Sequence, residues 1–324
     1  MAKIAVALQE AVRQRVLNGG AGGATARRLA EGAGWRVVDV ICTSGPDDRP
    51  FEEAHASVSI SMIVAGTFQY RTHTRRELLA PGAILLGNPG QSYECAHEHG
   101  NGDRCISFQY TPAFFERIVQ SHPGFRTARL PPLRAASPLV ARACAAVEGA
   151  SEAAWNTAAW EELAIEVAGQ TLRLANDVDV DGSAAAGQSA ISRVSRAVRA
   201  IELHHADALS LDALAQDAGL SPYHFLRTFT RITGVTPHQF ALRTRLRDAA
   251  TRLALDDARV IDVALDCGFG DVSNFNRTFR AEFGVAPRQY RAALNFRERP
   301  PSRARIHNGG TAPSRRPKSA SHCL

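Results

Sequence analysis

The chain has 324 residues, of which 45% are hydrophobic and 22% charged, and its formal net charge is +6. These proportions are ordinary for a folded globular protein and exclude a collagen-like or low-complexity chain. At about 150 residues per domain, two domains are expected. No apolar run approaches the roughly 20 residues that cross a bilayer, so we expect a cytoplasmic protein without a membrane partner.

Positive charge is concentrated towards the C-terminus. Residues 295–324 carry a net charge of +6 and residues 191–294 carry +3, whereas residues 1–190 carry −3. A polyanionic partner is therefore expected to bind the C-terminal third. The six cysteines are scattered without a CxxC pair, which favours free thiols over a disulfide framework.

The N-terminal segment is interpreted as an amphipathic helix followed by an extension. Glu10, Arg13 and Arg15 interrupt its apolar pattern, which is unlike the apolar core of a signal peptide.

Short strands are predicted between residues 34 and 110. Val58, Ile60 and Met62 alternate with serines, which is the period of a half-buried strand. Gly and Pro residues separate the strands and predict turns. Such a pattern favours a small β-barrel or sandwich. The expected strands are Trp35–Cys42, Ala56–Val64, Thr67–Tyr70, Ala83–Leu86, Ser92–Cys95 and Cys105–Tyr110.

Helices are predicted after this strand-rich region. The Thr-Pro pair at 111–112 and the Ser-Pro pair at 137–138 are typical of an N-cap followed by proline in the first helical position. Ala-rich stretches follow at Leu139–Val147 and Thr157–Asn176. We expect these helices to pack on the barrel and to leave a surface for a homodimer.

A 16-residue segment is repeated 50 positions later. Phe225–Phe240 reads FLRTFTRITGVTPHQF and Phe275–Tyr290 reads FNRTFRAEFGVAPRQY, with eight identical positions. Because solenoids need three or more stacked repeats, two copies indicate paired modules.

Each copy is predicted to be a helix-turn-helix unit. In the first copy, Ser210 caps a short helix, Gly219 supplies the positive φ of a sharp turn, and Ser221 caps a second helix. Gly268 and Asp271 occupy the corresponding places in the second copy. The phenylalanines shared by the copies recur at helical spacing and are expected to be core residues.

A long helix is predicted between the two units, from the Thr-Pro pair at 236–237 to about Leu255. At about 1.5 Å per residue it would measure roughly 27 Å, enough to hold two recognition helices near the ~34 Å spacing of adjacent major-groove turns. Arg243, Arg245 and Arg247 on this helix are candidates for phosphate contacts or for solvated charge.

Two motifs, LDALAQDAGLSPYHFLRTFTRITGVTPHQF and IDVALDCGFGDVSNFNRTFRAEFGVAPRQYR, are similar to the DNA-binding domain of the AraC/XylS family of transcription regulators. The resemblance covers residues 192–294. It implies seven helices, two helix-turn-helix units joined by a long helix, and control of transcription initiation at promoter DNA with RNA polymerase as a further partner.

The resemblance also implies which side chains read bases. Leu226 and Val272 lack hydrogen-bonding groups, so we expect at most apolar contact with a thymine methyl there. Arg231 shares the outward face of the first recognition helix and is added as a candidate. The base-reading positions implied by the resemblance are Tyr223, Leu226, Arg227, Val272, Ser273, Asn274 and Arg277.

The strand-rich region resembles the cupin-like effector domain of the same family through its architecture and the segment PGAILLGNPG at Pro81–Gly90. That resemblance implies a small-molecule or metal effector. The whole chain is therefore expected to be an α+β multidomain protein. Its expected divisions are an N-terminal helix and extension (1–30), a cupin-like sensor and dimerisation domain (31–175), a linker (176–190), the DNA-binding domain (191–294) and a disordered basic tail (295–324).

A candidate metal site lies in YECAHEHGNGDRC. Cys95, His97 and His99 alternate and would face one side of a strand, and Cys105 could return beside them. Two imidazoles and two thiolates could hold Zn²⁺ or Fe²⁺, or act as a thiol sensor. Alternatively, the imidazoles hydrogen-bond within a turn and the cysteines are small core residues. No other cofactor is expected.

Three hypotheses for function follow. The first is a sequence-specific, effector-responsive transcription factor without enzymatic activity. The second is a cupin-type metal-binding protein or enzyme with an appended DNA-binding domain. The third is a nonspecific nucleic-acid binder driven by the basic tail.

Overall fold

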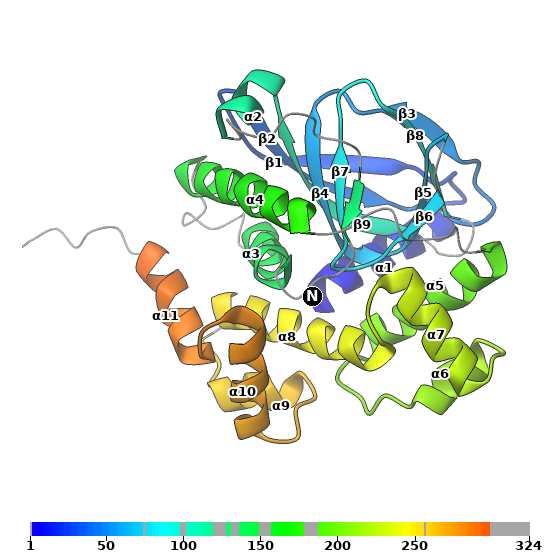
Figure 1. Ribbon diagram of the computed structural model, residues 1–324, viewed down its shortest axis with the longest axis vertical. Coiled ribbons are helices and arrows are strands. Elements are labelled where there is room, and N and C mark those ends of the chain that lie inside the picture. Colours follow the sequence, from blue (N-terminus) through cyan, green and yellow to red (C-terminus); the bar gives the residue numbers. More distant parts are fainter. Residues whose placement is uncertain are drawn as a thin grey trace, which may run out of the picture.

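The computed structural model describes residues 2–73, 76–97, 102–118, 128–130, 136–148, 157–177, 187–255 and 257–298 (Figure 1). A β-rich N-terminal part is followed by an all-helical C-terminal part, which makes the architecture α+β as expected. His99, most of the expected linker and most of the expected tail lie outside the described residues.

Two antiparallel sheets form the N-terminal part in the described residues. The larger has the strand order β1-β2-β9-β4-β7-β10 and the smaller the order β3-β8-β5-β6. Ile63 and Leu85 of the larger sheet share a core cluster with Phe68, Tyr70 and Leu79 of the smaller one, so the sheets enclose a common interior as in a cupin-like barrel. The strands are β1 (Ala24–Gly32), β2 (Trp35–Cys42), β3 (Phe51–Ala54), β4 (Val58–Gly66), β5 (Phe68–Arg71), β6 (Arg76–Leu79), β7 (Ile84–Gly87), β8 (Ser92–Ala96), β9 (Asp103–Tyr110) and β10 (Ala128–Leu130).

All six expected strands are present, and four further strands, β1, β3, β6 and β10, were not expected. Because β1 pairs with β2 from Ala24 to Gly32, the expected division at residue 30/31 falls inside a strand. Strand β1 could not be predicted from its sequence, ATARRLAEG. It is an exposed edge strand, and its sequence shows little alternation of apolar and polar residues.

Helices cover the outer face of the larger sheet. Ile60, Met62 and Phe108 point to this face and pack in one cluster with Trp160, and the Tyr110 hydroxyl donates a hydrogen bond of 2.7 Å to a helical carbonyl oxygen. The helices of this part are α1 (Ala2–Leu17), α2 (Pro112–Ile118), α3 (Ser137–Glu148) and α4 (Thr157–Asp177). The two Pro-initiated helix starts and both Ala-rich helices are confirmed.

Seven helices form the C-terminal part of the described residues, the number that the family resemblance implies. The last one extends four residues past the point where the tail was expected to begin, because helix-forming residues continue until the prolines at 300–301. The helices are α5 (Gln188–Leu203), α6 (Leu211–Asp217), α7 (Pro222–Thr233), α8 (Pro237–Leu255), α9 (Val260–Asp266), α10 (Val272–Phe283) and α11 (Pro287–Glu298).

The caps that separate these helices lie where the sequence predicts them. The side chains of Ser210, Ser221 and Asp271 accept hydrogen bonds from the third backbone N–H of the helix that each begins. Gly234 and Gly284 end α7 and α10 in the left-handed conformation, with φ of 81° and 79°. These short-range signals fix both helix-turn-helix units.

The repeated phenylalanines form the cores of the two units, as expected. Phe225 and Phe229 are fully buried in the first unit and Phe275 and Phe279 in the second. Truncating one such ring to alanine typically costs about 3–5 kcal/mol. Figure 1 shows α8 running between the two units, with α6 and α7 at one end and α9 and α10 at the other.

Both units also pack against the N-terminal part. Leu78 and Ala80, from β6 and the turn after it, belong to the core cluster of the first unit, and Ala141 of α3 belongs to that of the second. Among the helices that the structure describes, none is long and apolar enough to cross a membrane.

Candidate nucleic-acid interface

The first recognition helix, α7, presents a polar outer face. Tyr223 is 64% exposed and Arg227 and Arg231 are also exposed, whereas Leu226 is half-buried. The Arg227 guanidinium lies over the Tyr223 ring, 5.6 Å from its centroid, a geometry that favours the cation. Arg227 is thus oriented by a residue one turn earlier on its own helix.

The second recognition helix, α10, repeats this arrangement with different chemistry. Ser273, Asn274 and Arg277 are exposed and Val272 is half-buried. Arg277 donates a hydrogen bond of 3.0 Å to the Asn274 side-chain oxygen, so this arginine too is held by a residue one turn earlier. An exposed arginine and a nearby polar side chain are the groups that read guanine and adenine edges in a major groove.

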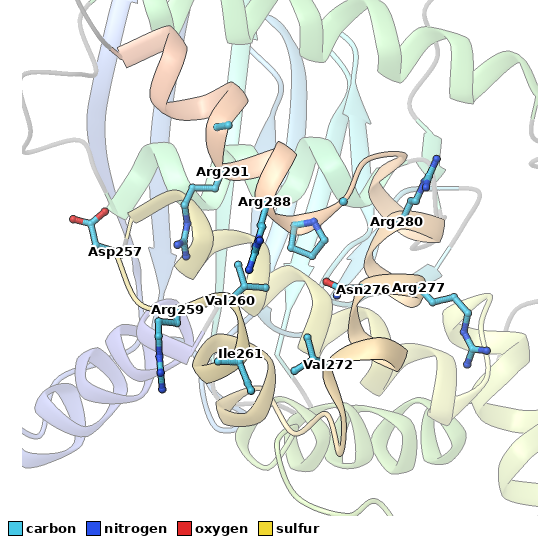
Figure 2. A pocket seen from close by; sticks show the side chains of 13 residues that line it. Asp257, Arg259, Val260, Ile261, Val272, Asn276, Arg277, Arg280, Arg288 and Arg291 are labelled. Carbon is cyan, nitrogen blue, oxygen red and sulfur yellow. The ribbon is translucent and has the colours of Figure 1, made fainter.

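A basic groove of about 1300 Å³ borders the second recognition helix. Figure 2 shows its arginines projecting from three elements, the start of α9, α10 and α11. Two of these arginines also bind groups within the protein, since Arg259 pairs with Asp262 and Arg291 donates to the carbonyl oxygens of Leu253 and Ala258. The exposed Arg280 and Arg288 suit a phosphate backbone. The arginines that line the groove are Arg259, Arg277, Arg280, Arg288 and Arg291.

Sequence reasoning identified only Arg277 of this set. The other four are separated along the chain. The sequence could have indicated them through one feature, the spacing of three residues between Arg277 and Arg280 in α10 and between Arg288 and Arg291 in α11. That spacing places each pair on one face of its helix. It does not predict that the arginine faces of α10 and α11 lie next to each other.

Arg243, Arg245 and Arg247 of α8 are buried or half-buried and bind groups within the protein, which fits neither interpretation offered for them. Arg247 is 1% exposed, and burial lowers its pKa to about 10. Arg243 is mostly buried and lies 3.5 Å from the Glu282 carboxylate. Arg245 donates hydrogen bonds to three backbone carbonyl oxygens, those of His205, Asp207 and Gly268. These arginines hold the helical part together and are not available for phosphates.

A buried carboxyl group joins α5 to the barrel. Glu202 is 7% exposed and accepts a hydrogen bond of 3.2 Å from the backbone N–H of Gly66. Burial raises its pKa to about 8, against the opposing effects of the Gly66 N–H, Arg247 and Arg199. This contact links the helical part to the end of β4.

A cluster of polar and aromatic side chains links the two sheets of the barrel. The His55 ring lies 3.1 Å from the Tyr70 hydroxyl and 3.2 Å from the Ser59 hydroxyl, and it stacks on Tyr93. Burial lowers the pKa of His55 to about 4, so its ring is neutral near pH 7. The Tyr93 hydroxyl donates to Glu53.

Of the four residues expected to form a metal site, His99 lies outside the described residues, and Cys95, His97 and Cys105 do not form a group of candidate ligands in the described part. Cys95 and Cys105 are half-buried thiols whose pKa values are raised by burial. His97 instead lies with Cys42 and Asp103, whose candidate ligand atoms are all within 4.8 Å of one another. The reason is the strand register, because Cys42 of β2 is paired with Asp103 of β9.

All three members of this Cys42/His97/Asp103 cluster are buried. The His97 Nε2 atom lies 2.7 Å from an Asp103 carboxylate oxygen. Burial alone would lower the pKa of His97, but hydrogen bonds to Asp103 and Cys42 raise it to about 10. Sequence reasoning missed Cys42 and Asp103 because no local spacing reveals which residues face each other across strands. All five cysteines of the described part are free thiols.

Comparisons with known proteins match both parts of the chain. Residues 214–293 match the model of a helix-turn-helix domain, and residues 38–168 match that of an AraC-like ligand binding domain. The regulatory protein PocR of Salmonella typhimurium is 32% identical over 111 residues, which are 34% of this chain and 37% of PocR.

Two further proteins match about a third of the chain. The HTH-type transcriptional activator RhaS of Escherichia coli is 36% identical over 104 residues, 32% of this chain and 37% of RhaS. The solved DNA-binding domain of AdpA, in complex with a target DNA, is 30% identical and covers 32% of this chain and 95% of that one, with a TM-score of 0.32. The chain thus spans 37% of the length of both curated relatives.

A cupin-like barrel followed by two helix-turn-helix units on one long helix is the architecture to which these matches correspond. The two family models and the curated relatives show that both parts of the chain are similar to the matching parts of AraC-type transcription regulators.

Proposed function

We propose that this protein is an effector-responsive transcription factor, without enzymatic activity, that binds promoter DNA through both helix-turn-helix units. The observation that carries the proposal is the equivalence of Arg227 and Arg277. Both are exposed, both lie on capped recognition helices, and each is oriented by a side chain one turn earlier. The basic groove beside α10 adds phosphate contacts that fix the position of the protein on DNA.

The effector is proposed to bind in the barrel. Support comes from its match to a ligand-binding family model and from the His55, Ser59, Tyr70 and Tyr93 side chains, which contact one another between the two sheets. Few polar groups with apolar walls are typical of small-molecule sites.

We also propose that the protein works in the cytoplasm as a homodimer and contacts RNA polymerase at the promoter. The dimer contact is proposed on the helices that cover the barrel, and α4 is one of them.

Binding to the DNA upstream of the protein's own gene and of neighbouring genes tests the proposal. We expect a discrete protected site whose affinity exceeds that for unrelated DNA by about 1000-fold or more. Equal affinity for all fragments would overturn the proposal.

A truncated chain separates this function from nonspecific binding by the basic tail. Removing residues 299–324 takes away six basic side chains. The salt dependence of binding should become weaker while the preference for the protected site remains. If the preference disappears with the tail, nonspecific binding is the better explanation.

A further inference from the structure

The Cys42/His97/Asp103 cluster lies at the end of the barrel that faces the helical part. Asp103 begins β9 and sits between two neighbours, with Cys42 of β2 as its partner on one side and Gly66 of β4 on the other. Gly66 is also the residue whose N–H donates to Glu202 of α5. The cluster is therefore one strand away from the contact between the barrel and the DNA-binding helices.

The chemistry of the cluster suits one class of ligand. A thiolate, an imidazole and a carboxylate are the donor types that bind Zn²⁺, and three protein ligands leave a fourth position open. Binding releases to solvent the Cys42 thiol proton and the proton that His97 shares with Asp103. Each member of the cluster has a candidate ligand atom within 4.8 Å of the others. Because an isolated buried charge is costly, a bound cation would stabilise a buried thiolate and carboxylate. The cluster forms no part of the proposed DNA contacts.

We propose that Cys42, His97 and Asp103 bind a thiophilic divalent cation of the Zn²⁺ class, and that occupancy of this site changes DNA affinity through Gly66 and Glu202. The second half of this proposal rests on the proposed function, whereas the binding site itself does not.

Cation binding must move the ligand atoms apart. The His97 and Asp103 atoms are in hydrogen-bond contact at 2.7 Å, whereas two ligands of a tetrahedral Zn²⁺ lie about 3.3 Å from each other, given metal–ligand distances near 2.0–2.2 Å. Binding therefore displaces Asp103, His97 or both by several tenths of an ångström.

The surroundings of Asp103 leave little room for such a shift. A Cβ atom at Gly66 would lie 2.3 Å from the Gly102 carbonyl oxygen and 2.8 Å from the Asp103 Cα. A Cβ atom at Gly102 would lie 2.2 Å from the Cys42 carbonyl oxygen. Because these backbones are in close contact, a displacement of Asp103 is passed to Gly66 and its hydrogen bond to Glu202. If the Gly66–Glu202 contact has two arrangements, a ligand that binds more tightly to one of them increases the fraction of molecules in that arrangement. The fraction of molecules able to bind DNA then changes with it.

Metal binding to the full-length protein tests the site. Zn²⁺ is titrated against a chromophoric chelator, and Co²⁺ is used as a spectroscopic probe, because a thiolate ligand gives it a charge-transfer absorption. We expect one ion per chain, a thiolate band in the wild type, and weakening by about 100-fold or more in Cys42→Ser and His97→Gln, since each removes one of three ligands.

Cys95→Ser and Cys105→Ser are the matched controls, because both thiols lie on neighbouring strand positions outside the cluster. They should retain the affinity and the band. Circular dichroism of every variant without metal verifies that the fold is kept. Wild-type affinity in Cys42→Ser, or loss of binding in the two control variants alone, would overturn the site.

The coupling is tested by measuring the affinity for the protected DNA site with Zn²⁺ and with a chelator. We expect a difference of about fivefold or more, the range of typical allosteric coupling. Glu202→Ala should still bind Zn²⁺ but lose this difference. If the wild type binds Zn²⁺ and its DNA affinity does not change, the coupling is refuted. If neither form prefers any DNA sequence, the proposed function fails while the metal site stands.

Discussion

Arg227 and Arg277 occupy the same position in the two repeats, yet different neighbours orient them. The first lies over the Tyr223 ring and the second bonds to Asn274. Because the local partners differ, we expect the two helices to prefer different base sequences. On the proposed function, we expect the repeat to supply one scaffold with two specificities.

Replacing either arginine should relax specificity over only one half of the binding site. We expect Arg227→Ala and Arg277→Ala each to cost about 1–3 kcal/mol against the preferred base, the value of one bidentate contact. The measurement is the affinity for a set of sites in which each base pair is varied. Arg196→Ala, an exposed arginine of α5, should leave the profile unchanged. Unchanged profiles for both recognition-helix variants would refute the assignment.

Glu202 makes stability depend on pH. An unfolded carboxyl titrates near 4.5, whereas burial raises the pKa of Glu202 to about 8 in the folded protein. The stability contributed by the neutral carboxyl is therefore complete below the unfolded value and decreases as the pH rises towards 8, by about 1.4 kcal/mol per pKa unit of difference. The charged groups that face it are Arg247 and Arg199, and Arg13 lines the adjoining cavity.

Urea unfolding at pH 5 and pH 8 measures this effect. The wild type should lose more stability between these values than Glu202→Gln, in which the side chain cannot ionise. Parallel losses in the two proteins would show that Glu202 does not carry the dependence.

At the level of helices and turns, the two units meet at one junction. A Cβ atom at Gly268 would lie 2.3 Å from the carbonyl oxygen of Ala206, which belongs to the connection before the first unit. Arg245 bridges the same place, because it donates to the carbonyl oxygens of His205, Asp207 and Gly268. The junction sets how the recognition helices are placed relative to each other.

The turn glycines of the two units should respond differently to alanine. Gly219 and Gly268 both have positive φ, of 62° and 83°, but a Cβ at Gly219 meets no atom within 4 Å. We expect Gly219→Ala to cost about 1–2 kcal/mol, the strain of the left-handed conformation alone. Gly268→Ala should cost clearly more, since it also pushes against backbone. Chemical denaturation of both variants tests this order, and equal losses would contradict the close contact at Ala206.

Removing the bridging guanidinium should weaken the junction. Arg245→Ala is expected to lower the free energy of unfolding by about 1–3 kcal/mol, because charged hydrogen bonds to three carbonyl groups are lost. Arg252→Ala is the control on the same helix, since its partly exposed ion pair with Asp266 should contribute less than about 1 kcal/mol. The two variants are compared by thermal unfolding. If Arg252→Ala is the more damaging change, Arg245 does not hold the junction.

The sequence predicted local structure well and long-range pairing poorly. The helix caps at Ser221 and Asp271 and the repeated phenylalanine cores depend on neighbours within one or two turns, so a single sequence reveals them. Strand β1 and the pairing of Cys42 with Asp103 depend on residues far apart in the chain. For the same reason the arginines of α8 were misplaced, because the partners that bury them come from other elements.

Over the whole molecule, the N-terminal part contacts both helix-turn-helix units. Leu78 and Ala80 reach the core of the first unit, while the Ser137 hydroxyl at the start of α3 donates a hydrogen bond of 2.7 Å to Glu282 of α10. Figure 1 shows α3 and α1 between the barrel and the long helix α8. A change in the barrel can therefore alter the position of either recognition helix.

Selection of binding sites from random double-stranded DNA by the purified protein tests the two-unit reading of DNA. The structure predicts two dissimilar half-sites whose centres lie about one helical turn, or 10–10.5 base pairs, apart. It also predicts that Arg227→Ala loses information in one half-site and Arg277→Ala in the other. A single half-site, or a selected pool with no sequence preference, would contradict the prediction that both units read DNA.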